Sequence, residues 1–318
     1  EILKTVKKGI VEKAGKSAGG RDIYIVRYGK PNNLNRSANL SSALGAKDAK
    51  YYADKTGADY RPTAFIVGAV HGAEVEGTAA LLNLIKIIET GTDFVGNENP
   101  FLENIVDDYN LIIIPCANPD GRARIPHKSF VGFSFEDFRY YGQGTWKNGE
   151  LCNWPDCKKI HPIKNAADFL GGYFNDDGIN MMHDNFFGEK APETALILET
   201  AERYSPDITI LLHGCTNANN HIINAKYVPE HIRERTHKFE EILKARYEAE
   251  GLPFNVAPMK LQENQNPPAP FNLNSAIYHI NGELSMTFES NQGLNYEGIS
   301  LNHDQIYRLH IILFEETF

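Results

Sequence analysis

The feature of this sequence that most constrains its fold is a set of short apolar runs, each followed by a segment of different character. Each run is rich in branched aliphatic residues and too short for a buried helix, which is typical of a strand covered on both faces. The runs lie at 63–70, 111–114, 207–212 and 284–288.

Segments with helical periodicity alternate with these runs. Apolar residues recur at helical spacing through 75–88, and further helices are predicted at about 192–204, 229–250 and 304–314. A strand, a helix and a strand in succession indicate a parallel pair. We therefore predict an α/β fold, with a single three-layer α/β/α domain over residues 1–318 and a twisted, mixed, mainly parallel sheet.

Two segments lie outside this alternation. Residues 31–60 are polar and have no clear period, and we interpret them as a surface insertion. Residues 122–190 also lack a period but contain many aromatic residues, and a loop of this length in a compact domain is usually functional. Because 42% of all residues are hydrophobic, the chain is able to bury a sizeable core beside these segments.

Charge and hydropathy argue against two classes of partner. The chain has 32 basic and 41 acidic residues, so no basic surplus is available to displace counterions from nucleic acid. The apolar runs fall far short of the roughly 20 residues that cross a bilayer, and we predict no membrane span. The chain starts at Glu1 without a methionine, as a mature secreted protein or a trimmed one would, and we expect a secreted or periplasmic location.

Four cysteines leave two alternatives open. Cys152 and Cys157 are close enough in sequence to close a small loop as a disulfide. Four idle thiols, including Cys116 and Cys215, are an equal alternative.

Polar side chains stand where several of the predicted strands end. His71, His213 and Glu289 each follow an apolar run directly, and Glu74 comes three residues after His71. Ligands of open α/β sheets bind beyond the carboxyl ends of the strands, where such residues converge. Two histidines and one glutamate suit an open catalytic zinc site, which keeps one position for water. A lone His-x-x-Glu motif is common by chance, so this hypothesis needs support from the rest of the chain.

That support is a resemblance to the zinc carboxypeptidases of the carboxypeptidase A type, of which this chain looks like a divergent bacterial-type member. Five motifs follow in the same order along nearly the full length: residues 15–23, His71-Gly72-Ala73-Glu74, Asn118-Pro119-Asp120-Gly121, Pro192-Glu193-Thr194 with 207–214, and Thr287-Phe288-Glu289. The resemblance implies that His71, Glu74 and His213 bind one Zn²⁺ and that Glu289 is the general base.

The chemistry of such a site predicts the reaction. Zinc polarises a carbonyl and lowers the pKa of its water from about 15.7 to ~7. A nearby carboxylate, here Glu289, takes a proton from water and passes it to the leaving amine. We therefore predict zinc-dependent hydrolysis of a peptide or related amide bond, by a metallocarboxypeptidase.

One segment departs from the family pattern. The family uses an Asp-x-Asn-Arg segment to hold the terminal carboxylate of the substrate, and the stretch 177–186 places Asn180 in that motif but Met181 where the arginine belongs. A thioether offers a carboxylate nothing comparable to a guanidinium. We therefore expect a weakened preference for free carboxyl termini.

Other residues are candidates for binding the terminal carboxylate and for the family's remaining catalytic roles. His183, Arg139 and Arg124 are candidates for the carboxylate. Arg122, Arg124 and Arg139 are candidates for stabilising the oxyanion, and Arg124 is favoured because it lies just behind a turn that is expected near the zinc. Tyr278 is the candidate for the family's mobile tyrosine.

Two other functions remain as alternatives. The chain resembles, more distantly, the succinylglutamate desuccinylase and aspartoacylase type of deacylase, which cleaves an N-acyl amino acid. Those deacylases generally keep the Asn-Arg pair, so Met181 counts against them as well. A non-catalytic binding module on the same fold would be signalled by loss of a metal ligand or of Glu289, and none of these is lost.

Overall fold

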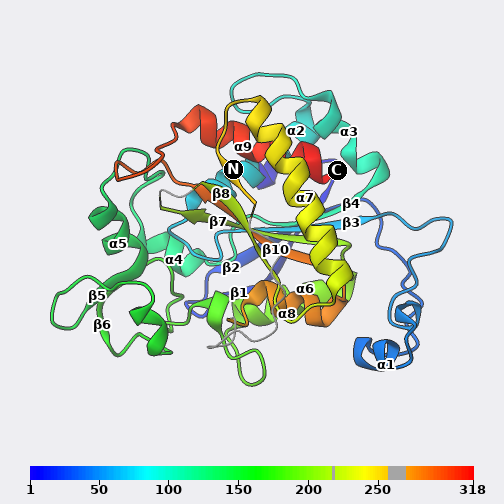
Figure 1. Ribbon diagram of the computed structural model, residues 1–318, viewed down its shortest axis with the longest axis horizontal. Helices are drawn as coiled ribbons and strands as arrows, with labels where there is room; N and C mark the ends of the chain where they lie inside the picture. The colour runs from blue at the N-terminus through cyan, green and yellow to red at the C-terminus, as the bar shows by residue number, and fades with distance from the viewer. Residues whose placement is uncertain (217–218, 257–269) are drawn as a thin grey trace.

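A computed structural model describes residues 1–216, 219–256 and 270–318 of the chain. Its centre is an eight-stranded sheet in the order β1-β2-β4-β3-β7-β10-β8-β9 (Figure 1). The strands are β1 (Ile10–Lys16), β2 (Asp22–Tyr28), β3 (Thr63–Gly68), β4 (Asn110–Ile114), β7 (Ile208–Cys215), β8 (Asn220–Asn224), β9 (Phe254–Asn255) and β10 (Leu284–Asn291).

The middle of this sheet is parallel and its flanks are mixed. Strands β4, β3, β7 and β10 pair in parallel, whereas β2 joins β4 and β8 joins β10 in antiparallel fashion. Every residue of β3 and β4 is buried, as expected of strands covered on both faces. The predicted mixed, mainly parallel sheet is therefore confirmed.

Helices cover both faces of the sheet and form the two outer layers. On one face, the alternate residues Ala64 and Ile66 pack in a core with α2 (Val75–Thr90), α3 (Pro100–Asp108), α7 (Glu230–Ala249) and α9 (His303–Thr317). On the other face, Phe65 and Val67 pack with α6 (Pro192–Tyr204) and α8 (Leu273–Asn281). In Figure 1, α2, α3 and α9 lie above the strands, and α6 and α8 lie below them. The three-layer prediction is thus confirmed.

The polar segment 31–60 is an insertion at the surface, as predicted. It contains α1 (Leu40–Gly45) and a short 3-10 helix, η2 (Ala49–Tyr51), and Figure 1 shows α1 standing away from the body of the molecule. The insertion has a small apolar cluster of its own, formed by Leu34, Leu40, Ala43, Tyr52 and Ala53.

The aromatic segment is more structured than the predicted single loop. It contains helices and strands that are too short to produce a recognisable periodicity in the sequence. They are α4 (Pro119–Arg124), α5 (Phe135–Gln143), β5 (Gly144–Trp146), η3 (Asp156–Lys159), β6 (Ala167–Leu170) and η4 (Met181–His183). Its aromatic side chains pack on one another in a third core cluster, in which Cys152 and Cys157 are buried. The predicted turn at Asn118 is the start of α4, where the Asn118 side chain accepts a hydrogen bond of 2.8 Å from Gly121 N.

Several elements were not predicted, among them β1, β8, α3 and α8. In the described ranges, no helix combines the length and the apolar character that a membrane crossing requires.

Candidate metal centre and active site

The candidate residues meet at the carboxyl ends of the parallel strands. His71 follows β3, Glu74 is the residue before α2, His213 lies on β7 and Glu289 lies on β10. His71, Glu74 and His213 are buried, with exposed fractions of 7%, 3% and 2%. Three separate strands thus deliver polar side chains to one edge of the sheet, as the sequence predicts.

Close packing of the backbone holds the turn that carries His71 and Glu74. Gly72 N donates a hydrogen bond of 2.7 Å to the carbonyl of Gly172. A Cβ atom at Gly72 would lie 2.1 Å from the backbone nitrogen of Arg122, so only glycine fits between the two segments. The glycine therefore lets the turn press against the start of the aromatic segment.

The carboxylate of Glu74 stands between the two imidazoles. Its Oε1 lies 2.9 Å from His71 Nδ1, and its Oε2 lies 2.8 Å from His213 Nδ1. Gly214 N donates a hydrogen bond of 3.1 Å to Oε2, which fixes the carboxylate in this position. Burial opposes ionisation of Glu74, but the two histidines outweigh it and lower the pKa of this carboxyl.

Asn180 contacts the ring nitrogen of His71 that points away from Glu74. Its Oδ1 accepts a hydrogen bond of 3.0 Å from Met182 N and also lies 3.0 Å from His71 Nε2. The amide oxygen can accept a hydrogen bond from Nε2–H of His71, and Nδ1 is the ring nitrogen that faces Glu74.

This arrangement fits a zinc ion. The ligand atoms of His71, Glu74 and His213 all lie within 4.8 Å of one another, and they are of the nitrogen and oxygen types that zinc binds. The contact from His71 to Asn180 is the second hydrogen bond that metal-bound histidines almost always make. Tyr173 stacks on His71 with ring centroids 4.2 Å apart and adds to the fixed orientation of the imidazole.

Glu289 lies beside the candidate metal ligands but is not part of their cluster. It is paired with His213 in the parallel register of β10 and β7, and with His221 in the antiparallel register of β10 and β8. Burial raises the pKa of Glu289 to about 7, with His213 opposing the shift and Glu74 adding to it. A carboxyl that titrates near neutrality suits proton transfer.

A cavity of about 510 Å³ opens over these residues. His71, Glu74, His213 and Glu289 form part of its wall, and a volume of this size is usual for a small-molecule or peptide site. The rest of its lining includes six residues of the aromatic segment: Phe135, Trp154, Lys158, Tyr173, Met182 and His183.

Comparison with known proteins agrees with this geometry. A model of the zinc carboxypeptidase family matches residues 7–285, which is most of the chain. The chain belongs to the zinc carboxypeptidase family. A search of curated proteins found no match to this chain.

Solved structures show that this zinc carboxypeptidase family member shares its fold with metallocarboxypeptidases. A metallo-carboxypeptidase from Burkholderia cenocepacia has 16% sequence identity and a TM-score of 0.61, and the alignment covers 99% of this chain and 66% of that one. A metallo-carboxypeptidase from Pseudomonas aeruginosa, in complex with (2-guanidinoethylmercapto)succinic acid, has 13% identity and a TM-score of 0.59, covering 99% and 64%. Carboxypeptidase A from Helicoverpa armigera has 13% identity and a TM-score of 0.52, covering 99% and 68%. The chain spans about two thirds of the length of these structures.

Two of the predicted substrate-binding residues lie at the site. Asn180 contacts His71, so in this zinc carboxypeptidase family member it orients a candidate metal ligand. His183 lines the cavity, and burial together with the charge of Lys158 lowers the pKa of His183 to about 3. Because it stays neutral, His183 cannot replace the positive charge of an arginine.

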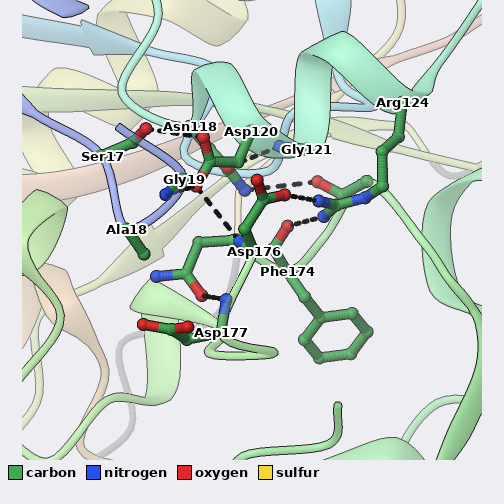
Figure 2. Close-up of polar contacts among 12 residues, drawn as sticks. Ser17, Ala18, Gly19, Asn118, Asp120, Gly121, Arg124, Phe174, Asp176 and Asp177 are labelled. Atoms are coloured by element: carbon green, nitrogen blue, oxygen red, sulfur yellow. Dashed lines mark hydrogen bonds and ion pairs between the residues drawn. The ribbon is translucent and has the colours of Figure 1, made fainter. Parts of the chain in front are cut away.

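The structure does not bring Arg124 to the cavity, contrary to the expectation for an oxyanion-stabilising residue. Figure 2 shows its guanidinium bound to Asp176 and to the carbonyl of Phe174, and it also donates to the carbonyl of Gly171 at 3.2 Å. These contacts hold the segment that carries Tyr173. The described contacts of Arg124 are therefore with the segment beside the cavity, and its side chain is not part of the cavity lining.

Arg122, Arg139 and Tyr278 also lie elsewhere. Arg122 donates to the carbonyls of Ile125 and His127. Arg139 donates to the carbonyls of Leu151 and Cys152, and Tyr278 is buried in a small cluster beside α7. None of these side chains lines the described cavity.

Met181 does not occupy the position expected from the motif. Its side chain is fully buried in the core cluster between the sheet, α6 and α8, and the residues that face the cavity are Met182 and His183. The family motif predicted that Asn180 and residue 181 would contact the substrate. Asn180 contacts His71 instead, and the residues that line the cavity are Met182 and His183, two and three positions after it.

Two motifs of the family resemblance meet in a structural cluster around Asp120, which Figure 2 shows. Asp120 is fully buried and accepts hydrogen bonds from the Ser17 hydroxyl, Gly19 N, the Arg21 guanidinium and Asp176 N. Residues 15–23, the start of α4 and the segment beside Tyr173 are thereby joined.

Sequence reasoning missed Lys158, Trp154 and Tyr173. All three lie in the segment without periodicity, and the sequence carries no signal that separates them from the aromatic and basic residues around them.

Proposed function

We propose that this chain is a zinc-dependent metallopeptidase that removes a residue from the carboxyl end of a peptide. The observation that carries the proposal is the juxtaposition of a buried His-Glu-His ligand set with a partly buried glutamate on the next strand, in the wall of one cavity. Membership of the zinc carboxypeptidase family supports the same chemistry.

His71, Glu74 and His213 would hold one zinc ion, which supplies Lewis-acid chemistry by polarising the amide carbonyl and acidifying water. Asn180 keeps the proton of His71 on Nε2, so that Nδ1 is free to bind. Glu289 takes the proton from water and then donates it to the leaving amine. Tyr173 fixes the plane of the His71 ring, and because burial raises its pKa well above the usual range, its hydroxyl stays neutral.

A substrate panel tests this proposal. The zinc-loaded protein is incubated with N-blocked peptides and with N-acyl amino acids, and products are identified by mass spectrometry. We expect release of carboxyl-terminal residues from the peptides by the wild-type protein and not by Glu289→Gln. Cleavage of N-acyl amino acids alone would support the deacylase alternative, and cleavage of neither substrate class would contradict the proposal.

A further inference from the structure

Lys158 is the one lysine or arginine among the described residues of the cavity wall. It lies on η3. The histidines of the wall are candidate metal ligands, lie beside Glu289, or are kept neutral by burial, as His183 is. Among the described lining residues, Lys158 is therefore the side chain that brings a positive charge to the cavity.

An aromatic ring, not an acid, holds this ammonium group. Lys158 Nζ lies 4.3 Å from the centre of the Trp154 ring, a cation–π contact. Asp156, the acidic residue nearest in sequence, forms an ion pair with Lys159 instead: Lys159 Nζ lies 2.7 Å from Asp156 Oδ1. Within the described part of the chain, no carboxylate lies within ion-pair distance of Lys158.

Burial without a carboxylate partner leaves the ammonium group undercompensated. Lys158 is half-buried, and burial lowers its pKa. An arriving anion would restore the missing charge, and such charge-assisted contacts are among the stronger hydrogen bonds in proteins. The ammonium of Lys158 also lowers the pKa of His183, so its charge acts on the inside of the cavity.

The acids of the cavity lie at the metal centre. Glu74 is committed to His71 and His213, and Glu289 lies beside His213 on the next strand. The cavity thus has a metal-binding, proton-accepting end and a second wall with one lysine and a tryptophan ring.

We infer that Lys158 is a specificity-determining residue that binds a carboxylate of the substrate while the scissile amide lies at the metal centre. This inference rests on the proposed function. The same chemistry has two sources: the α-carboxylate of the last residue, or the side-chain carboxylate of an acidic residue. Lys158 recognises either as a point charge, since an ammonium group lacks the planar fork of a guanidinium.

Binding to zinc-loaded Glu289→Gln separates this inference from turnover. Calorimetry compares N-acetylphenylalanine, which has an α-carboxylate, with N-acetylphenylalaninamide, which has none, and with the α-amide of N-acetylglutamic acid, whose carboxylate is in the side chain. The acid that binds more tightly than the neutral amide shows whether the cavity selects the α-carboxylate or the side-chain carboxylate. Lys158→Gln is then added to the same background, with zinc content measured in each protein.

We expect Lys158→Gln to reduce the advantage of the better acid over the neutral amide by about 10- to 100-fold, the usual range for a hydrogen bond to a charged group. Lys158→Arg should restore most of the advantage. Lys159→Gln is the matched control, because this neighbour is exposed and bonded to Asp156, and it should leave the advantage unchanged.

Three results would overturn the inference. If Lys158→Gln weakened binding of the acids and of the neutral amide by the same factor, Lys158 would have a structural role only. An undiminished advantage in Lys158→Gln would show that the carboxylate is held elsewhere, for example on the metal. No advantage for either acid in the Glu289→Gln background would show that the cavity does not select a carboxylate. Because binding needs no turnover, failure of the proposed function would appear separately, as absent peptide cleavage by the wild-type protein.

Discussion

Glu289 and His213 occupy paired positions on neighbouring parallel strands, β10 and β7. A strand pairing alone therefore places the candidate general base beside a candidate metal ligand. The sheet fixes this relationship, because both strands lie in its buried middle and a shift of register would expose their apolar residues.

Glu289→Gln should keep bound zinc and lose most of its turnover. The amide preserves the shape of the side chain but cannot accept a proton, and general-base catalysis commonly contributes about 100- to 10,000-fold in rate. Turnover of the best peptide substrate and metal content per chain are measured together. Near-normal turnover with zinc bound would remove Glu289 from the mechanism.

Asn180→Ala should weaken zinc binding by about 10- to 100-fold, the usual effect of losing a group that orients a metal-bound histidine. The reason is that His71 would lose the acceptor that keeps its proton on Nε2. Competition with a coloured chelator gives the affinity. Asn180→Asp is the control, since it keeps an acceptor oxygen, and a loss of affinity in both variants to the same degree would argue against this role.

Met181→Arg should destabilise the protein by roughly 3 kcal/mol or more, because it places an unpaired charge in a fully buried position. It should not increase the preference for free carboxyl termini, since position 181 does not face the cavity. Urea denaturation gives the free energy of unfolding, and Met181→Leu is the control of similar volume. A stable Met181→Arg protein with a stronger preference for free acids would contradict the observed placement.

Arg124→Ala should lower the free energy of unfolding by about 1–3 kcal/mol, since its partners on Phe174 and Gly171 would lose their donors. Turnover should fall only slightly, because Arg124 does not line the cavity and its loss would affect the site only by shifting Tyr173. The test compares unfolding curves with kinetics at saturating zinc. Unchanged stability with a large fall in kcat would instead support the oxyanion role predicted from the sequence.

The sequence predicts the metal centre better than it predicts the rest of the cavity. His71, His213 and Glu289 directly follow apolar runs of the sequence, and the carboxyl ends of parallel strands converge whatever their detailed packing. By contrast, η4 has only three residues, and no periodicity indicates which of residues 181–183 faces the cavity. Contact of Asn180 with His71 decides this, and it joins positions 109 residues apart in the chain.

The aromatic segment could not be predicted for a related reason. Its short helices and strands are held by contacts with distant segments, such as those of Arg124 and Asp120 to Asp176. Lys158 and Trp154 acquire their positions in the cavity wall from this packing, so their residue types alone gave no indication of a role.

We propose that one zinc ion at His71, Glu74 and His213 drives peptide hydrolysis. The most direct test is to remove metal with a chelator, titrate zinc back into the protein and follow cleavage of a peptide substrate. We predict that activity is absent without metal, rises with added zinc and reaches its plateau at one ion per chain, and that His213→Ala shows no such rise. Full activity in the metal-free protein, or an equal rise in His213→Ala, would contradict the account.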